Sequence, residues 1–419
     1  MRSHLFALAL LFTSQALFAA DWPQWRGPDR NGISKETGLL PEWPKEGPKL
    51  LWQVNDIDYG YSTPSVVGDR LYLMSNKGDS DEFVRALSVT DGKIVWSMRV
   101  GKVGPNQGMN YAAARSTPTV DGDVLYALGS NGDLACLEIS AGKIKWQKNL
   151  RKDFGGQPGM WAYAESPFVD GDVLVCTPGG KDATIVCLNK KNGAVIWKCA
   201  VPDGDAAAYA SIVIVEIGGQ KQYVQFLSKG LVGVDAKTGR FLWRYAKTAI
   251  GSPAVIPTPV AHANLIYTGA ARTGGGLVKI SADNGKDRAE EVYFERGLPV
   301  AIGGAILIDG NLYGTNAEGL LCADFATGKV KWQDKSIGTG SLFCAENRLY
   351  IHGENGQVAL VEVSADGYHE KGRFTPPDPP KHIRGGMEKS WVYPVVANGR
   401  LYVRDAGTLW CYDVKKAGR

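Results

Sequence analysis

The chain lacks the motifs of several common catalytic classes. It contains no P-loop, no G-x-S-x-G nucleophile turn and no C-x-x-C pair, which excludes the usual phosphate-binding, serine-hydrolase and zinc-knuckle sites. His is scarce, with five in 419 residues, and those beyond the first 20 residues are not spaced as a metal pair: His262, His352, His369 and His382. The sequence therefore predicts no metal site.

A large excess of charge of one sign is also missing. The chain has 47 Lys and Arg against 43 Asp and Glu, and the two signs are interspersed without a basic stripe. Binding to a phosphate backbone requires such a stripe, so we do not expect a nucleic-acid partner. The composition is 44% hydrophobic and 21% charged, which is typical of a folded globular protein with a substantial core.

Long apolar runs are confined to the first 20 residues, "MRSHLFALALLFTSQALFAA". A basic start, an apolar stretch and small residues at its end are typical of an export signal. A membrane anchor is the alternative, but the run is broken by "TSQ" and is shorter than the roughly 20 apolar residues that span a bilayer. No Cys that could carry a lipid follows it. We predict a signal peptide at residues 1–20 and a periplasmic or secreted protein without a stable membrane anchor.

The rest of the sequence is a repeat. A short apolar strand, a tight turn and a second strand centred on Leu-Tyr recur, as in "STPTVDGDVLYALGS" and "VYPVVANGRLYVRD". Eight copies are marked by the central residue of the second strand: Tyr72, Tyr126, Val175, Tyr223, Tyr267, Tyr313, Tyr350 and Tyr402. Asp-Gly and Asn-Gly pairs between alternating apolar runs indicate β-hairpins.

Each copy continues with a third strand, a Gly turn and a fourth strand that usually ends in Trp, as in "LLCADFATGKVKW". Four antiparallel strands at this spacing are typical of a β-propeller blade. The Trp is expected to pack between neighbouring blades, and the turn Gly to supply a backbone conformation that other residues avoid.

The eighth copy ends at "LWCYDVKKAGR" with no fourth strand, whereas "KLLWQV" before the first copy is a fourth strand alone. Joining the two would close the ring and leave no bare sheet edge. The sequence thus predicts an all-β, eight-bladed propeller of four-stranded antiparallel blades, its last blade closed by the N-terminal strand.

Seven Cys are present, and four occupy one repeat position: Cys136, Cys187, Cys322 and Cys411. Free Cys behaves as a small buried apolar residue, so we interpret most of them as packing residues. Because Cys176 and Cys187 lie on consecutive strands around a turn, a disulfide between them is a further hypothesis.

The unit at Cys322–Trp332, with "GVDAKTGRFLW" and "ALSVTDGKIVW", resembles the pyrroloquinoline quinone (PQQ) repeat of quinoprotein alcohol dehydrogenase-like propellers. The resemblance covers residues 48–416, the predicted propeller domain, and residues 21–47 resemble the leader that precedes the ring and covers it. This family includes PQQ-dependent dehydrogenases and non-enzymatic propellers such as the lipoprotein of the outer-membrane barrel assembly machinery. If this chain were of the dehydrogenase type, the resemblance would imply PQQ with Ca²⁺ in the central funnel, a catalytic Asp and often a disulfide between adjacent Cys. No adjacent Cys pair occurs here, and no catalytic or metal residue carries over.

In a propeller, the loops that lead into the first strands open onto one face of the central channel. Here these loops are rich in aromatic residues with a few charges, which suits stacking on a planar or sugar-like ligand or anchoring a protein partner. The predicted ligand-binding residues are Tyr61, Tyr111, Arg115, Trp161, Tyr163, Glu165, Arg384, Trp391 and Tyr393. The alternative is that the rings merely plug the channel.

The leading hypothesis is an exported, non-catalytic binding or scaffold module that acts through this channel face and carries no cofactor. The alternative is a PQQ-dependent oxidoreductase acting on alcohols or sugars, with PQQ and Ca²⁺ bound and Trp161 or Trp391 as the stacking floor.

Overall fold

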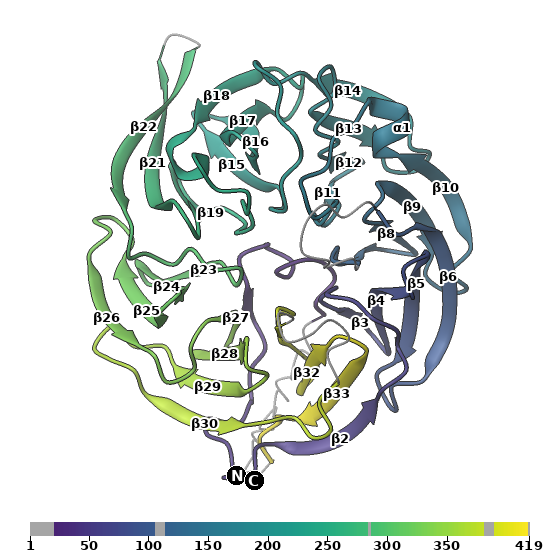
Figure 1. The fold of residues 1–419 in the computed structure, drawn as a ribbon, viewed down its shortest axis with the longest axis vertical. Coiled ribbons are helices and arrows are strands. Elements are labelled where there is room, and N and C mark those ends of the chain that lie inside the picture. The colour runs from purple at the N-terminus through teal and green to yellow at the C-terminus, as the bar shows by residue number, and fades with distance from the viewer. Residues whose placement is uncertain (1–20, 105–113, 284–285, 381–388, 418–419) are drawn as a thin grey trace, which may run out of the picture.

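Eight antiparallel sheets surround a central channel in the computed structural model, which describes residues 21–104, 114–283, 286–380 and 389–417 (Figure 1). Seven sheets have four strands, and one has a fifth strand from the N-terminal leader. The prediction of an eight-bladed propeller is therefore confirmed. The predicted signal peptide, Tyr111 and Arg384 lie outside the described residues.

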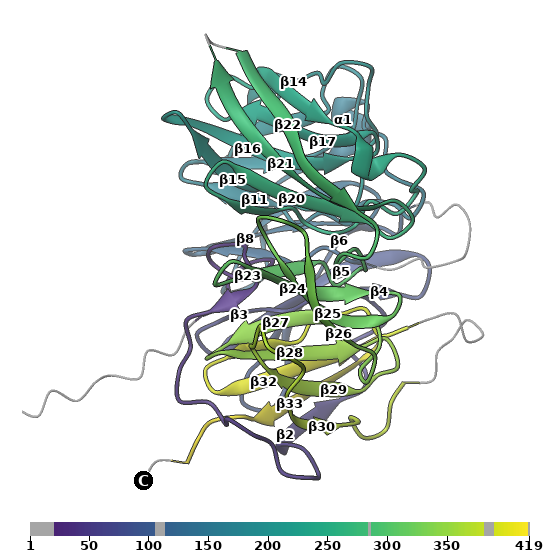
Figure 2. The same cartoon turned by 90° about the vertical axis from the view of Figure 1, so that its left-hand side faces the viewer.

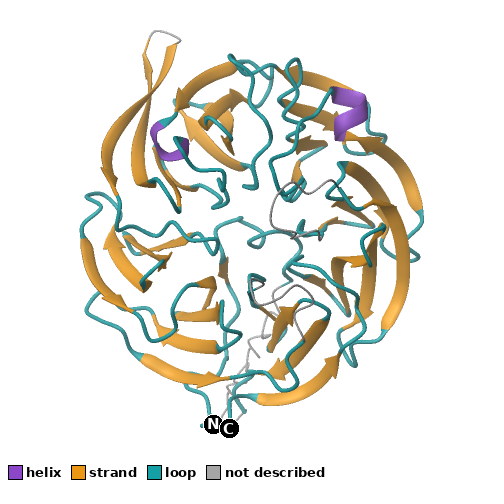
Figure 3. Ribbon diagram, in the orientation of Figure 1, coloured by secondary structure: helices purple, strands orange, loops and turns teal. Residues whose placement is uncertain are grey.

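In blades 1 to 7, the chain runs from the channel outwards through four consecutive strands, and in blade 8 it does so through three (Figures 1 and 3). Blades 1 to 4 are built from β3(Ser65–Val67), β4(Arg70–Lys77), β5(Asp81–Ser88) and β6(Ile94–Lys102); β7(Thr119–Asp121), β8(Val124–Leu128), β9(Asp133–Glu138) and β10(Ile144–Asn149); β11(Phe168–Asp170), β12(Val173–Cys176), β13(Ile185–Asn189) and β14(Val195–Cys199); and β15(Val213–Ile217), β16(Gln220–Leu227), β17(Gly230–Asp235) and β18(Phe241–Tyr245).

Blades 5 to 8 follow the same order, and seen edge-on the blades form a thick disc (Figure 2). Their strands are β19(Val260–His262), β20(Leu265–Ala270), β21(Gly274–Asp283) and β22(Lys286–Glu295); β23(Ala305–Ile308), β24(Asn311–Asn316), β25(Gly319–Asp324) and β26(Val330–Asp334); β27(Gly340–Ala345), β28(Arg348–Gly353), β29(Val358–Glu362) and β30(Glu370–Phe374); and β31(Val395–Ala397), β32(Arg400–Asp405) and β33(Thr408–Asp413).

The N-terminal strand β2(Lys49–Val54) completes blade 8, as the sequence predicts. It pairs antiparallel with β33, with Trp52 opposite Cys411 and Gln53 opposite Trp410. The two ends of the chain therefore build one sheet, and the outer edge of β33 is not left bare.

The blade-end Trp residues connect neighbouring blades. The Trp52 indole donates a hydrogen bond from Nε1 to the Val89 carbonyl of blade 1 at 2.9 Å, and the Trp96 indole donates in the same way to Ile139 of blade 2. A Cβ on Gly92 would lie 2.7 Å from the Trp52 ring, and the φ of Gly92 is +71°. Gly is therefore required at this turn for two reasons, its backbone conformation and the close approach of the indole.

All seven Cys residues are buried and free. The proposed disulfide between Cys176 and Cys187 is wrong. In the hairpin of β12 and β13, Cys176 lies opposite Val186 and Cys187 lies opposite Val175. This offset of one residue directs the two thiols to opposite faces of the sheet, where Cys176 and Cys187 join different core clusters.

The leader, the purple segment that precedes β2, lies across the channel (Figure 1). Trp22 bridges to Val66 of blade 1, and β1(Ile33–Ser34) pairs in parallel with β27 of blade 7. Farther along, the Trp43 amide donates to the Lys371 carbonyl. The leader thus contacts several blades before it enters the ring as β2.

The described residues include two short helices between strands, α1(Leu150–Phe154) and η1(Lys247–Ala249). Within the described ranges, no helix has the length and apolar character needed to cross a membrane.

Candidate functional site

Hydroxyl groups form part of a ring around the channel and join blades 2 to 5. It arises from the recurring Ser/Thr-Pro sequence that precedes the first strands, with Ser211 followed by Ile in place of Pro in blade 4. The Thr117 amide donates to Ser166 Oγ at 2.9 Å, the Ser166 amide donates to Ser211 Oγ at 2.9 Å, and the Ser211 amide donates to Thr258 Oγ1 at 3.4 Å. These bonds hold successive blades in a fixed position, so the loops above them are placed by a rigid base.

A cavity of about 350 Å³ lies above this ring. It is lined by loops that lead into the first strands and by the leader, and its wall is mostly apolar. The lining residues are Trp25, Tyr61, Thr63, Arg115, Trp161, Ala164, Ser166, Tyr209, Ser211, Ala254, Ile256, Pro257, Ala271, Val300, Ile302, Trp391 and Tyr393. We call this space the aromatic cavity.

Three pairs of aromatic rings form much of the wall of the aromatic cavity. The ring centroids of Tyr61 and Trp391 are 5.3 Å apart, and those of Trp161 and Tyr209 are 5.6 Å apart. The Trp25 ring meets Tyr393 edge-on at 4.6 Å. Large, flat apolar faces of this kind bind rings and planar groups at low conformational cost.

Arg115 is the charged residue of this wall. Its Nη1 donates to the Trp161 carbonyl at 2.8 Å, and its guanidinium lies 5.7 Å from the centroid of the Tyr61 ring. Burial lowers the pKa of Arg115, although Tyr61 and Glu82 act in the opposite direction. The guanidinium is therefore held in place between two of the aromatic pairs.

The structure brings five of the predicted site residues together in the aromatic cavity, namely Tyr61, Arg115, Trp161, Trp391 and Tyr393. Two others do not line it. The Tyr163 ring packs in the core of blades 2 and 3, where its hydroxyl donates to the Pro178 carbonyl at 2.8 Å. Glu165 is buried below the loop, where one oxygen accepts from the Thr177 amide at 2.5 Å and the other from Gln225 Nε2 at 2.9 Å.

Trp25 is the main cavity residue that the site prediction did not include. Its Nε1 donates to Thr258 Oγ1 at 2.9 Å, which fixes the leader to the hydroxyl ring. No periodicity in the sequence connects the leader to the channel. The hydroxyl residues, by contrast, carried a readable signal in the repeated Ser/Thr-Pro pairs.

The described wall of the aromatic cavity has few groups that could transfer protons. Among the described residues that line it there is no Asp, Glu, His, Lys or Cys, the usual acids, bases and nucleophiles. Burial raises the pKa of Tyr209, and it raises the pKa of Tyr393 to about 12, so both phenols stay protonated near neutral pH. Across the described part of the chain, no three His, Cys, Asp or Glu side chains gather to form a metal site.

A buried carboxyl group near this wall makes the stability depend on pH. Glu82 accepts hydrogen bonds from the amide and the hydroxyl of Ser130, but burial raises its pKa from the ordinary 4.5 to about 7. The folded state therefore holds a proton that the unfolded chain has released between pH 4.5 and about 7. The stabilisation that the folded state gains from this proton is fully present below pH 4.5 and is lost as the pH rises through 7.

Between pH 4.5 and 8, the unfolding free energy of the wild type should fall as Glu82 loses its proton. In the Glu82→Gln variant we expect this fall to be smaller by on the order of 2–3 kcal/mol. Urea unfolding at four pH values measures this decline. The control is Glu216→Gln, at an exposed position of β15, which should leave the decline unchanged. Equal declines in wild type and Glu82→Gln would contradict the assignment.

Comparison with protein-family models assigns the chain to a family. The family model described as outer membrane protein assembly factor BamB matches residues 33–177 and 80–334, which together span more than half of the sequence. The chain belongs to this family of PQQ-like repeat propellers. The predicted resemblance to the PQQ-repeat propellers is therefore confirmed.

The curated relatives of this family member include both enzymes and assembly factors. Tetrathionate hydrolase of Acidithiobacillus ferrooxidans is 24% identical over 262 residues, which cover 53% of this chain and 48% of that protein. BamB of Moranella endobia is 29% identical over 175 residues, covering 39% and 40%. BamB of Burkholderia pseudomallei is 22% identical over 288 residues, covering 67% and 68%. The chain thus spans half or less of the length of the first two relatives.

Solved structures share the fold at low sequence identity. BamB from Moraxella catarrhalis aligns with a TM-score of 0.57 and 15% identity, covering 88% of this chain and 98% of that one. A europium-containing methanol dehydrogenase aligns with a TM-score of 0.64 and 11% identity, covering 92% and 89%. A quinohemoprotein alcohol dehydrogenase from Comamonas testosteroni aligns at 0.53 and 12%, covering 95% and 81%. These structural similarities establish the propeller fold, and the chemistry must be inferred from the residues of the site.

Proposed function

We propose that this protein is an exported, non-catalytic binding module that takes a planar or ring-shaped group into the aromatic cavity. The observation that carries the proposal is the composition of the described wall: six aromatic rings and one guanidinium, with no carboxylate or imidazole among the described lining residues. Such a wall can hold a ring between flat faces, and it offers no described acid or base to convert it.

The bound group can belong to a small planar or sugar-like molecule or to an aromatic side chain of a protein partner. Tyr, Trp and Arg are also the residues enriched in the anchors of protein interfaces. Several relatives bear the name of outer membrane protein assembly factor, and a scaffold role for this chain agrees with that name.

The second candidate is a PQQ-dependent oxidoreductase. Flat aromatic walls beside Arg115 favour this candidate, because a planar quinone would stack on the rings and its acidic groups would face the guanidinium. However, the described residues provide no cluster of metal ligands for the Ca²⁺ of such enzymes, and the described part of the cavity wall has no Asp to act as a base. The described residues therefore do not fit this cofactor system.

The proposal predicts that the Trp161→Leu variant binds a planar probe at least tenfold more weakly than wild type, about 1.4 kcal/mol. Fluorescence titration with PQQ, with and without Ca²⁺, measures the affinity. The matched control is Trp332→Leu at the half-buried outer position of blade 6, which should bind as wild type does.

Two outcomes would contradict the proposal. Equal affinities for wild type and Trp161→Leu would remove the cavity as the binding site. Reduction of a dye on addition of alcohols or sugars to the PQQ-loaded protein would show catalysis and favour the oxidoreductase.

A further inference from the structure

A second cavity, of about 360 Å³, lies at the other end of the channel. The chain passes from one cavity to the other in several blades: in blade 4, Tyr209 and Ser211 line the aromatic cavity, and Val213 and Ile214 line the second one. The leader separates them, because Trp25 lines the first and Arg26 the second. We call this second space the leader cavity.

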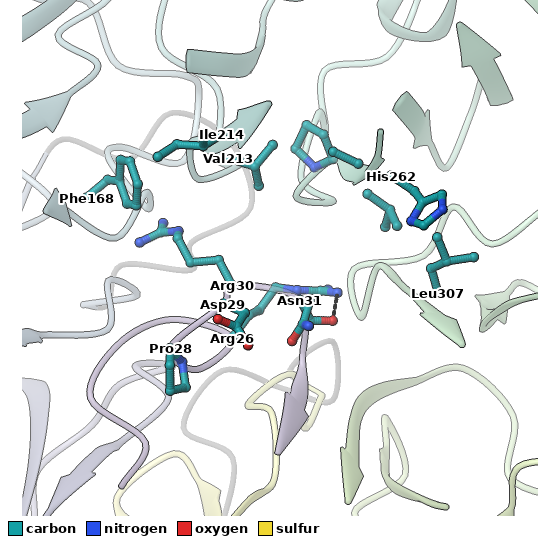
Figure 4. A pocket seen from close by; sticks show the side chains of 13 residues that line it. Arg26, Pro28, Asp29, Arg30, Asn31, Phe168, Val213, Ile214, His262 and Leu307 are labelled. Atoms are coloured by element: carbon teal, nitrogen blue, oxygen red, sulfur yellow. Dashed lines mark hydrogen bonds between the residues drawn. The ribbon is translucent and has the colours of Figure 1, made fainter. Parts of the chain in front are cut away.

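The leader occupies only one side of this end of the channel. The Val120 amide of blade 2 donates to the Pro23 carbonyl, and Ile33 pairs with Cys344 of blade 7. The turn from Pro28 to Asn31 then faces the first strands of blades 3 to 6. The leader cavity is the space left between this turn and those strands (Figure 4).

Two buried arginines of the leader line this space. Arg26 is 4% exposed and Arg30 is 5% exposed. Arg26 Nη2 donates to the Ala305 carbonyl at 2.6 Å and to the Asn31 carbonyl at 2.9 Å. Arg30 donates from Nη2 to Ser166 at 3.2 Å, and from Nη1 to the Pro167 carbonyl at 3.4 Å and the Gln24 side chain at 3.1 Å.

Every one of these acceptors is a neutral oxygen. No carboxylate among the described residues forms an ion pair with either guanidinium, and the Nε of each is buried without a hydrogen-bond partner. Asp29, which also lines the cavity, is half exposed and pairs with Lys35 at 3.0 Å. Burial lowers the pKa of both arginines, that of Arg30 to about 9.

The largest electrostatic compensation for Arg30 comes from Glu165, which forms no ion pair with it. Burial raises the pKa of Glu165 to about 7, so its negative charge is incomplete near neutral pH. Two buried cations with so little compensation are costly, and an anion brought beside them would offset that cost.

The remainder of the wall of the leader cavity is polar at Asp29, Asn31 and His262 and otherwise apolar. Phe168, Val213, Ile214, Val260 and Leu307 contribute to it, and the Arg30 guanidinium lies 4.9 Å from the centroid of the Phe168 ring. Figure 4 shows Arg30 extending toward Phe168, with His262 and Leu307 on the far side. A ligand that fits has one anionic end and an apolar body.

We propose that the leader cavity binds a small organic carboxylate, its acid group beside Arg30 and Arg26 and its apolar body against the first strands of blades 3 to 6. The carboxylate can come from a free acid or from the C-terminus of a peptide. This site is separate from the aromatic cavity and does not rest on the function proposed for it.

The test uses isothermal titration calorimetry of the full mature protein with 4-phenylbutyrate and with a dipeptide that ends in a free Phe carboxylate. Each is compared with its neutral amide. At least one acid is expected to bind tenfold or more tightly than its amide, and the better of the two acids identifies the source of the carboxylate. Equal binding of acid and amide in both pairs would overturn the proposal.

Variants locate the binding. Arg30→Gln should weaken binding of the acid at least tenfold, whereas Lys45→Gln, at an exposed position on the same leader, should not. Leu307→Trp should abolish binding by filling the cavity, and it keeps the test decisive if Arg30→Gln does not fold. Trp161→Leu should bind the acid as wild type does. Loss of acid binding in Trp161→Leu, or its retention in Leu307→Trp, would overturn the proposal.

Discussion

Replacement of Lys49–Val54 by a Gly-Ser linker of the same length should open the ring. The six residues of β2 form the outer strand of blade 8, so the variant loses the ladder to β33 and the contacts of Trp52. Loss of a buried Trp alone costs about 3–5 kcal/mol, and we expect at least this fall in unfolding free energy. The bare edge of β33 should also promote association between chains.

Hydrogen exchange and light scattering measure both effects. The amides of β33 should lose protection, and the mean mass should rise with concentration. The control is the double variant Leu50→Ser and Leu51→Ser, whose side chains are 38% and 39% exposed on the same strand; it should change stability by less than about 0.5 kcal/mol per site. A linker variant that stays monomeric with β33 protected would show that closure does not depend on this strand.

The Arg404→Met variant should lower the unfolding free energy by about 3–5 kcal/mol. Arg404 in β32 is fully buried and donates to the carbonyls of Ser62 and Met74 of blade 1 at 2.9 and 2.8 Å, and to Ala406 at 3.2 Å. Met fills similar space without a donor, so these carbonyls lose their side-chain donor at the junction between blades 8 and 1.

An opposing effect decides how large the loss is. Burial lowers the pKa of Arg404 to about 9, which shows that the charge itself is costly to bury. Nearby Asp405 and Asp58 offset part of that cost, and we expect the unsatisfied carbonyls to dominate. Denaturant unfolding measures the balance, with Arg240→Met at an exposed turn of blade 4 as the control. Unchanged or increased stability would mean that the cost of the buried charge exceeds the value of its hydrogen bonds.

The sequence predicted the blades because their determinants are local. Alternation of apolar and polar residues, Gly turns and a terminal Trp repeat within each unit, and hairpin pairing depends on residues close along the chain. Even the closure by β2 could be predicted, because an unpaired fourth strand and an unpaired hairpin complement each other.

The residues that line the aromatic cavity were predicted only in part. Tyr163 and Tyr209 occur in similar loops, yet Tyr209 lines the aromatic cavity and Tyr163 turns into the core beside Leu150. The disulfide hypothesis failed for a related reason. The sequence placed Cys176 and Cys187 on adjacent strands, but the register of the hairpin, which differs by one residue, separated them.

The sequence by itself determined the number of blades, the order of their strands and the closure of the ring, since each of these follows from a repeated local pattern. Only the tertiary structure decided that the leader enters the channel, that Trp25 and Arg26 face two different cavities, and which aromatic loop residues meet. The loops and the leader have no repeat, so the directions of their side chains are set by packing between segments far apart in the chain.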